Sequence, residues 1–329
     1  MNLSVIGGGS WGTALAAHLA RSGHRTRLFV RDGELARRVL EDRENRAYLP
    51  GVALPDALMA SADLDAACRE AEAIFVVTPS QYCREIYARL RDAAPRPAWL
   101  VSATKGLETE TLLRMSEVAA QAAPGHGLAV LSGPSFALEV AQGQPTAVVV
   151  ASSDRTLAEG LQRALSTRRF RAYSSDDVVG VELAGALKNV IAIAAGIVDG
   201  LGYGANTAAA LITRGLVEIT RLAVARGGRA DTLAGLAGLG DLVLTCTGAL
   251  SRNRRVGQAL GRGLSPEAAT QAAPGMVAEG VRTTLAACAL AELSRVEMPI
   301  ARAMKAVLYE AKPVRETLDE LMSRSLKRE

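Results

Sequence analysis

The first half of the chain alternates short apolar runs with segments of helical periodicity. Apolar runs of this length are typical of the buried strands of a parallel sheet. The helical segments between them lie at about residues 11–22, 81–93 and 111–122. Such alternation predicts a doubly wound, mainly parallel α/β sheet. The predicted strands are Leu3–Ile6, Arg27–Val30, Ala73–Val77, Trp99–Ser102, Leu128–Leu131 and Ala147–Ala151.

The pattern changes at about Asp176. Strand signals disappear there, and long segments rich in alanine and leucine continue to the end of the sequence. A chain of 329 residues is long enough for two domains. We therefore expect a sheet-containing, dinucleotide-binding domain over residues 1–175 and an all-helical substrate domain over residues 176–329.

Composition and charge exclude several classes of protein. The 38 basic and 34 acidic residues give a net charge of +4, which is too small to indicate nucleic-acid binding. The four cysteines lack CxxC spacing and are typical of reduced thiols in a cytoplasmic protein. The N-terminal segment has no features of a signal peptide, and no uninterrupted apolar run is long enough to predict a membrane span. No cluster of ligands predicts a metal site.

A glycine-rich turn directly follows the first predicted strand. The segment Gly7–Gly12 satisfies the pattern GxGxxG and opens an amphipathic helix. Gly7 would allow a tight turn, Gly9 the approach of a pyrophosphate, and Gly12 close packing of the helix on the sheet. Phosphate would bind the exposed amides and the positive dipole of the helix start. The context predicts a dinucleotide site, with a purely structural glycine turn as the alternative.

The end of the second predicted strand bears on the choice of cofactor. An acidic residue there would accept hydrogen bonds from the ribose 2′-hydroxyl of NAD. This chain has Arg31 followed by Asp32. A guanidinium suits the 2′-phosphate of NADP, unless Arg31 is simply a solvated residue at a strand end. We therefore expect NADP to be preferred and NAD also to be accepted.

One lysine lies inside one of the most apolar segments of the chain. In the stretch GALKNVIAIAAGIVDG, a helix would place Lys188 on a face with Ala184 and Ile191. Such a lysine either extends its ammonium group to solvent or is desolvated and exchanges protons near neutral pH. The three histidines, His18, His24 and His126, are not in acid–base settings. Lysine is therefore the remaining candidate to protonate an alkoxide formed by hydride transfer.

Further polar groups follow glycine-rich turns. Ser102–Gly106 and Ser132–Phe136 come directly after predicted strands, where the carboxyl ends of parallel strands line a ligand crevice. Asp241 and Thr245 would lie one turn apart on the same helix face. The run Ser251–Arg255 resembles a helix start with serine as N-cap. It predicts either a solvated helix end or a phosphate-binding cradle.

The chain carries, in this order, the motifs GGGSWGTALA, NRAYLPG, TKG, GPSFALEV, KNVIAIAAGIVDGLGYG, ALITRG, GLAGLGDLVLTC, SRNRRVG, AEGVRT and EMPI. This ordered set resembles the bacterial NAD(P)-dependent glycerol-3-phosphate dehydrogenases. The resemblance covers nearly the whole chain, although Ala205 and Ala208 stand where many relatives carry an aspartate and a basic residue.

The resemblance implies the reduction of dihydroxyacetone phosphate to sn-glycerol 3-phosphate, which supplies phospholipid synthesis. It implies that Lys188 is the general acid–base, with Asn189, Asp241 and Thr245 orienting it or binding the substrate. It assigns two further sets of residues. The substrate set is Lys105, Gly133, Ser135, Ser251, Arg252 and Asn253, and the cofactor set is Ser10, Trp11, Arg31, Tyr48, Lys105, Ala137, Arg252, Val277 and Glu279, besides the glycines.

Two other functions remain open at this point. A related lysine-dependent reductase of β-hydroxy or keto acids would share the nucleotide domain and the helical domain. It would have less need of the cradle at Ser251–Arg255, because its substrate carries a carboxylate. A non-catalytic NADP-binding sensor would have little need of an acid–base lysine. The sequence is compatible with a homodimer and does not determine the oligomeric state.

Overall fold

The computed structural model describes residues 1–271 and 278–323, and all structural statements below concern these residues. The chain divides into two compact units, which are described separately. The first unit comprises residues 1–105 and 113–182, and the second comprises residues 106–112 and 183–329. The change of pattern expected after Ser175 coincides with the end of a strand, whereas the division between the units falls between Glu182 and Leu183, inside a helix.

The first unit is built on one eight-stranded sheet with the strand order β3-β2-β1-β4-β5-β6-β7-β8. All neighbouring strands run parallel except β6 and β7, which are antiparallel. The order of the first six strands is that of dinucleotide-binding folds, and it reverses between β1 and β4. The strands are β1 Asn2–Ile6, β2 Arg25–Phe29, β3 Leu58–Ser61, β4 Ala73–Val76, β5 Trp99–Ser102, β6 Gly127–Ser132, β7 Thr146–Ala151 and β8 Phe170–Ser175.

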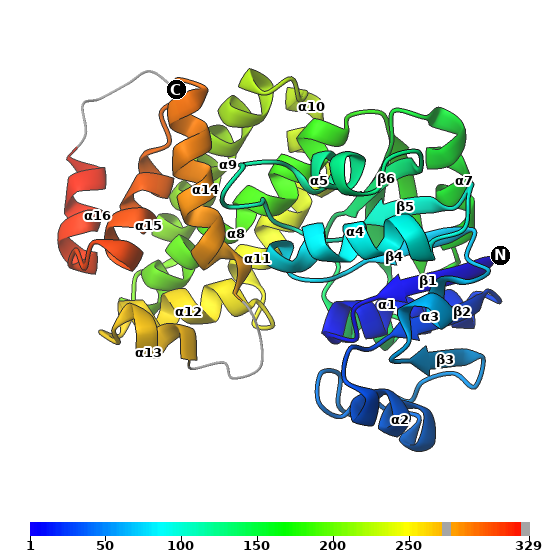
Figure 1. Cartoon of the computed structure of the whole chain (residues 1–329). Helices are drawn as coiled ribbons and strands as arrows, with labels where there is room; N and C mark the ends of the chain where they lie inside the picture. Colours follow the sequence, from blue (N-terminus) through cyan, green and yellow to red (C-terminus); the bar gives the residue numbers. More distant parts are fainter. Residues whose placement is uncertain (272–277, 324–329) are drawn as a thin grey trace. The chain divides into compact units, whose positions relative to one another are not determined.

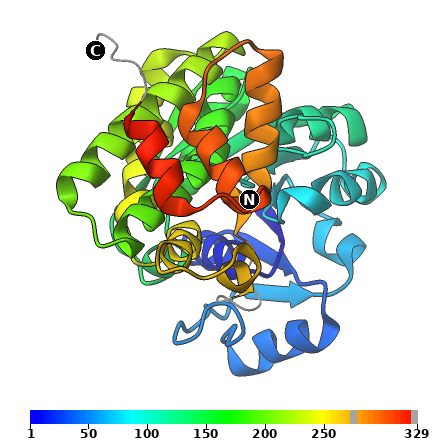
Figure 2. The same ribbon diagram turned by 90° about the vertical axis from the view of Figure 1, so that its left-hand side faces the viewer.

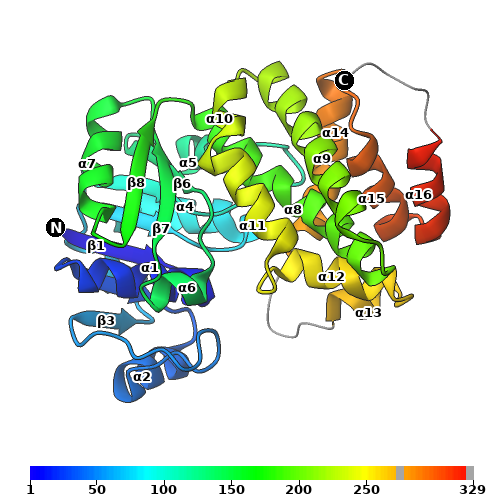
Figure 3. The same cartoon turned by 180° about the vertical axis from the view of Figure 1, so that it is seen from behind.

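Helices cover both faces of this sheet (Figures 1 and 3). Successive side chains of a strand point to opposite faces, so Leu3 and Val5 pack in one core while Ile6 packs in the other. The helices on the first face are α1 Ser10–Arg21, α2 Gly33–Asp42, α6 Ala137–Ala141 and α7 Arg155–Leu165. Those on the second face are α3 Leu64–Cys68, α4 Cys83–Ala93, which follows the 3-10 turn η1 Ser80–Tyr82, and α5 Met115–Ala122.

The second unit is helical, as the sequence predicts. Its last three helices, α14, α15 and α16, follow one another side by side (Figure 2). The helices are α8 Val178–Gly200, α9 Ala205–Ala225, α10 Ala230–Ala234, the π-helical turn η2 Leu236–Gly240, α11 Asp241–Thr247, α12 Arg252–Gly261, α13 Pro266–Gln271, α14 Glu279–Leu293, α15 Pro299–Tyr309 and α16 Val314–Met322. The first residues of α8, up to Glu182, belong to the first unit.

Helices α8 and α12 pack backbone against backbone. A Cβ atom added at Gly196 would lie 2.0 Å from the carbonyl oxygen of Arg254, and one added at Gly257 would lie 1.9 Å from that of Ile193. Glycine at these positions is therefore required for the two helices to approach this closely. The contact fixes the start of α12 relative to α8, and both helices carry candidate site residues.

The six predicted strands are all present, and the fold class is confirmed. Two strands that the sequence did not predict are β3 and β8, which form the two edges of the sheet. The helix expected over residues 111–122 begins only at Met115, because Leu112 has a left-handed backbone (φ 60°) and Arg114 precedes the first turn as N-cap.

Helix α8 has the length and composition of a membrane-spanning helix, with a mean hydropathy of 1.7, and it is the one such helix among the described residues. Its entire apolar window is nevertheless buried inside the protein. This burial is typical of a core helix, whose neighbours are side chains rather than lipid.

Candidate active site

The glycine-rich turn has the conformation that its sequence pattern predicts. Gly7 has φ +128°, and a Cβ atom there would lie 2.6 Å from the carbonyl oxygen of Val77. A Cβ atom at Gly12 would lie 1.9 Å from the carbonyl oxygen of Gly7, whereas one at Gly9 would meet no atom within 4 Å. Helix α1 starts here without a side-chain cap and without an acidic residue in its first turn. Its amide groups and its positive dipole are thus suited to an anion.

The segment Asn45–Gly51 lies against this turn. The hydroxyl of Ser10 donates to the carbonyl oxygen of Tyr48 at 2.6 Å. The indole N–H of Trp11 is buried and has no hydrogen-bond partner within the described part of the chain. Tyr48 itself is half-buried.

At the end of β2, the two residues that bear on cofactor choice have different environments. Arg31 is exposed. Asp32 is the N-cap of α2, and its carboxylate accepts a hydrogen bond from the Leu35 amide at 3.0 Å. The aspartate therefore already serves the helix that follows it.

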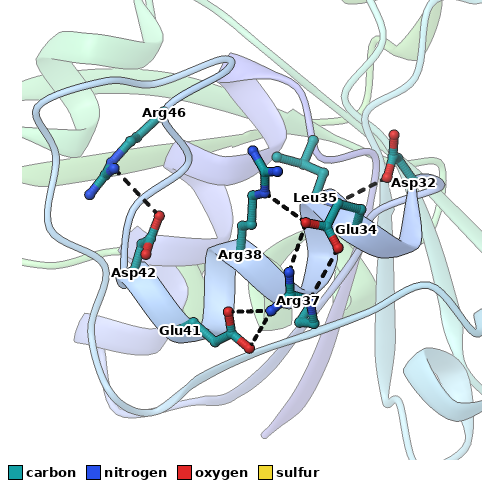
Figure 4. A network of polar contacts seen from close by, with 8 residues as sticks. All are labelled: Asp32, Glu34, Leu35, Arg37, Arg38, Glu41, Asp42 and Arg46. Atoms are coloured by element: carbon teal, nitrogen blue, oxygen red, sulfur yellow. Dashed lines mark hydrogen bonds and ion pairs between the residues drawn. The ribbon is translucent and has the colours of Figure 1, made fainter.

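The other arginines of this region are paired with acids along α2 (Figure 4). Arg37 and Arg38 both contact Glu34, and Arg37 also contacts Glu41. The hydrogen bonds from Arg37 and Arg38 lower the pKa of the Glu34 carboxyl to about 2. In the described part of the chain, Arg31 thus forms no ion pair, unlike Arg37, Arg38 and Arg46 beside it.

Lys105 lies directly beyond the carboxyl end of β5. Its Nζ donates to the carbonyl oxygen of Gly133 at 2.8 Å and to the Ser135 hydroxyl at 3.4 Å. The Ser135 hydroxyl donates to the same Gly133 carbonyl at 2.9 Å. Lys105, Gly133 and Ser135 therefore lie together beyond the carboxyl ends of the neighbouring strands β5 and β6, and helix α6 begins two residues later at Ala137.

In the second unit, Lys188 is buried and paired. Its residue surface is 5% exposed, and its Nζ forms an ion pair with Asp241 and donates to the Thr245 hydroxyl at 2.9 Å. The Thr245 hydroxyl donates to the main-chain carbonyl of Asp241 at 2.6 Å. The side chain therefore does not extend to solvent. Its counter-ion, which its own helix face lacks, comes from α11.

A chain of amide hydrogen bonds joins three helices next to this pair. Asn253 donates through Nδ2 to Oδ1 of Asn189 at 2.9 Å, and its Oδ1 accepts from the Gly280 amide at 2.9 Å. Both asparagines are buried. The arrangement links α8, the first turn of α12 and the first turn of α14.

The start of α12 has the predicted cap. The Ser251 hydroxyl accepts a hydrogen bond from the Arg254 amide at 3.2 Å. The adjacent Arg252 is half-buried, and burial lowers the pKa of its guanidinium, an effect that the neighbouring Glu279 carboxylate opposes. Arg252 and Glu279 thus interact electrostatically within this unit.

The predicted residues are divided between the two units, and we call the two sets the first and the second assembly. The first unit holds the glycine turn, Ser10, Trp11, Arg31, Tyr48, Lys105, Gly133, Ser135 and Ala137, and the second holds Lys188, Asn189, Asp241, Thr245, Ser251, Arg252, Asn253 and Glu279. Val277 lies outside the described residues. Within residues 1–271 and 278–323, no three or more histidine, cysteine or acidic side chains gather in a way that could hold a metal ion.

One buried residue in the first assembly was not singled out by the sequence. Asn45 is fully buried, and its side-chain amide contacts both the glycine turn and α1. The only signal was its place in the motif NRAYLPG. That motif alone does not show whether the asparagine stabilises its own turn or donates to a different loop.

Comparison with known proteins covers both assemblies. The family profile described as NAD-dependent glycerol-3-phosphate dehydrogenase N-terminus matches residues 2–158, and the profile of the C-terminus matches residues 177–319. Glycerol-3-phosphate dehydrogenase (NAD(P)+) from Geobacter sp. (strain M21) is 51% identical over 99% of this chain and 98% of its own length. The crystal structure of glycerol-3-phosphate dehydrogenase from Coxiella burnetii has a TM-score of 0.94 and 42% identity, covering 98% of this chain and 99% of its own.

A second kind of enzyme shares the fold alone. The PanE/ApbA family ketopantoate reductase from Ralstonia eutropha JMP134 has a TM-score of 0.63 at 16% identity, covering 98% of this chain and 100% of its own. At this identity the likeness carries no information about the substrate.

Proposed function

The chain belongs to the NAD-dependent glycerol-3-phosphate dehydrogenase family, and we propose that it reduces dihydroxyacetone phosphate to sn-glycerol 3-phosphate with NADPH in preference to NADH. The observation that carries the proposed chemistry is Lys188, buried against Asp241 and Thr245. A buried ammonium group with fixed partners is placed to donate a proton to an oxygen that gains negative charge.

The proposed reaction adds one hydride and one proton across the ketone. When bound, the reduced nicotinamide supplies the hydride to the carbonyl carbon. Lys188 donates a proton from Nζ to the carbonyl oxygen, which becomes the secondary hydroxyl. Asp241 and Thr245 hold Nζ in one position, since each contacts it directly. Asn189, on the same helix, is proposed to contact the substrate through its side-chain amide, whose Oδ1 accepts a hydrogen bond from Asn253.

The substrate phosphate is proposed to bind at the start of α12. Ser251 caps this helix, and Arg252 adds a guanidinium whose pKa is lowered by loss of water, so its charge is poorly compensated by solvent. Such a group binds a dianion strongly. Asn253, Lys105, Gly133 and Ser135 complete the proposed substrate set.

The cofactor is proposed to bind to the first unit, which would act as the dinucleotide-binding part of the chain. The open space at Gly9 and the uncapped start of α1 fit a pyrophosphate. Arg31 fits a 2′-phosphate because Asp32 is engaged as a helix cap. The further cofactor contacts that we propose are Gly7, Ser10, Trp11, Gly12, Tyr48, Lys105, Ala137, Arg252 and Glu279.

The second unit would then act as the substrate and catalytic part. We also propose a cytoplasmic location and a role in supplying glycerol phosphate for phospholipid synthesis. All four cysteines are buried and none forms a disulfide bond, which suits a reducing compartment.

One assay separates this function from a keto-acid reductase. The rate of NADPH oxidation is measured with dihydroxyacetone phosphate, with unphosphorylated dihydroxyacetone and with ketopantoate. The proposal requires the phosphorylated ketone to give the highest kcat/KM by orders of magnitude. A preference for ketopantoate would replace it with the alternative. Cofactor binding without turnover of any of the three substrates would favour a sensor.

A further inference from the structure

The segment Asn45–Gly51 contributes only Tyr48 to the proposed function, yet it holds the glycine turn from one side. Asn45 has no exposed surface. Its Nδ2 donates to the Gly8 carbonyl oxygen at 2.9 Å and to the Thr13 hydroxyl at 2.8 Å. Its Oδ1 accepts from the Tyr48 amide at 3.3 Å. Every polar group of this side chain is thus used, and two of the contacts fall on the turn and on α1.

The contact with Gly8 has a geometric consequence for Gly9. A trans peptide group is planar, so the N–H of one residue points opposite to the C=O of the residue before it. Since Asn45 holds the Gly8 carbonyl, the Gly9 amide must point away from Asn45. Glycine restricts the backbone least, so the direction of this peptide group depends on its side-chain donors, which are Asn45 at 2.9 Å and the Thr13 hydroxyl at 3.4 Å.

The space beside Gly9 is open where a side chain would begin. A Cβ atom at this position would meet no atom within 4 Å, and Gly9 is the N-cap of α1. An amide held in one direction at a helix start is a donor that needs no reorganisation when an anion binds.

A second set of contacts keeps the segment itself in place. Leu49 and Val52 are buried in a small apolar cluster with Ala14 of α1, and Trp11 and Ala137 pack against it. The Ser10 hydroxyl also donates to the Tyr48 carbonyl oxygen. Asn45 therefore acts from a fixed support and not from a mobile loop.

We propose that Asn45 is a positioning residue of the dinucleotide site, which sets the direction of the Gly9 amide toward the pyrophosphate of the cofactor. It contacts the backbone of the turn and not the cofactor. This inference rests on the cofactor site proposed above.

The test compares two ligands that differ in the pyrophosphate. Dissociation constants for NADPH and for adenosine 2′-monophosphate, which has no pyrophosphate, are measured by calorimetry on the wild type, Asn45→Ala and Asn45→Asp. We expect both variants to bind NADPH at least about 10-fold more weakly, because the Gly8 carbonyl loses a buried donor. The aspartate should be the weaker binder, since it cannot donate and adds a negative charge near the phosphates. Affinity for adenosine 2′-monophosphate should change less than about 2-fold.

The matched control is Ser152→Ala, which removes a buried hydroxyl that donates to the Leu128 carbonyl oxygen at 2.7 Å elsewhere in the same unit. It should lower stability without changing either dissociation constant. Steady-state kinetics add an independent readout: KM for NADPH should rise in the Asn45 variants while KM for dihydroxyacetone phosphate stays nearly constant. Asn45→Asp nearly preserves side-chain volume, so it provides the measurement if Asn45→Ala does not fold.

Three results would overturn parts of this reasoning separately. Unchanged NADPH affinity in both variants would remove Asn45 from the site. Equal weakening of both ligands would indicate general damage to the unit, which also contradicts the positioning role. A wild-type protein that does not bind NADPH would instead contradict the proposed function.

Discussion

The buried ion pair of Lys188 and Asp241 allows a prediction in which the free energy of unfolding recovers in a double variant while kcat does not. Lys188→Met removes the ammonium group and leaves the Asp241 carboxylate, which is 1% exposed, without its counter-ion. Removing one partner of a buried ion pair costs about 3–5 kcal/mol. The same change removes the proposed proton donor, which lowers kcat by at least about 100-fold.

The double variant Lys188→Met/Asp241→Leu tests the assignment. Replacing both charges by apolar groups of similar volume is often neutral or stabilising. The Thr245 hydroxyl keeps its hydrogen bond to the main-chain carbonyl of residue 241 in this variant. The double variant should therefore regain most of the free energy of unfolding that the single variant loses. Its kcat should stay as low as that of Lys188→Met.

Urea unfolding followed by circular dichroism measures the free energy of unfolding, and NADPH oxidation with saturating substrates measures kcat. The control is Lys305→Met on α15, whose partner Glu310 is 3.7 Å away and whose side chain is 41% exposed. It should alter the free energy of unfolding by less than about 0.5 kcal/mol, with unchanged kcat. A Lys188→Met protein with near-normal kcat would refute the acid–base role. One with wild-type stability would refute the buried charge pair.

Three further predictions follow from the contacts of single residues. Arg31→Ala should weaken the binding of NADPH by about 1.5–3 kcal/mol in a titration and leave the binding of NADH nearly unchanged, because the lost contact is charge-assisted. Equal losses of binding free energy for the two cofactors would contradict the 2′-phosphate role of Arg31. The control is Arg38→Ala, because the Arg38 guanidinium is paired with Glu34. Arg252→Ala should lower kcat/KM for dihydroxyacetone phosphate by at least about 100-fold, with little effect on the slow turnover of unphosphorylated dihydroxyacetone, since the anchoring energy comes from the phosphate. The control Arg255→Ala, at an exposed position, should leave both rates unchanged. An equal loss of rate with both substrates in Arg252→Ala would mean that the phosphate binds elsewhere. Glu218→Ala should lower the free energy of unfolding by about 1–3 kcal/mol, because the buried Glu218 carboxylate accepts hydrogen bonds from the Ile300 and Ala301 amides at the start of α15. An unchanged free energy of unfolding in calorimetry would contradict this capping role.

The sequence predicted the centre of the sheet better than its edges. In β4 all four residues are buried, because helices cover both faces, and such a strand is a continuous apolar run. In β3 and β8, the two edge strands, exposed positions such as Met59 and Tyr173 interrupt the apolar pattern. A short run with one buried side cannot be told from a loop by periodicity alone.

The same limit applies to the nucleotide site. The glycine turn was predictable because its motif acts locally on the backbone, and the absence of a Cβ atom permits φ +128° at Gly7. Asn45 was not predictable, because its partner Gly8 is 37 positions away and asparagine is a common residue of turns. Local chemistry can be derived from the sequence, whereas a contact across that distance needs the fold.

Lys188 shows why an apolar sequence and a charged site belong together. Its own helix supplies only apolar neighbours and no counter-ion. The sequence therefore allowed two interpretations, an ammonium group extended to solvent or a desolvated one, and could not decide between them. The partners come from α11, where Thr245 is 57 positions further along the chain and Asp241 lies one helical turn before it. Apolar neighbours exclude water, and with less water the attraction between ammonium and carboxylate becomes stronger. The apolar residues of α8 around Lys188 therefore strengthen its pairing with Asp241.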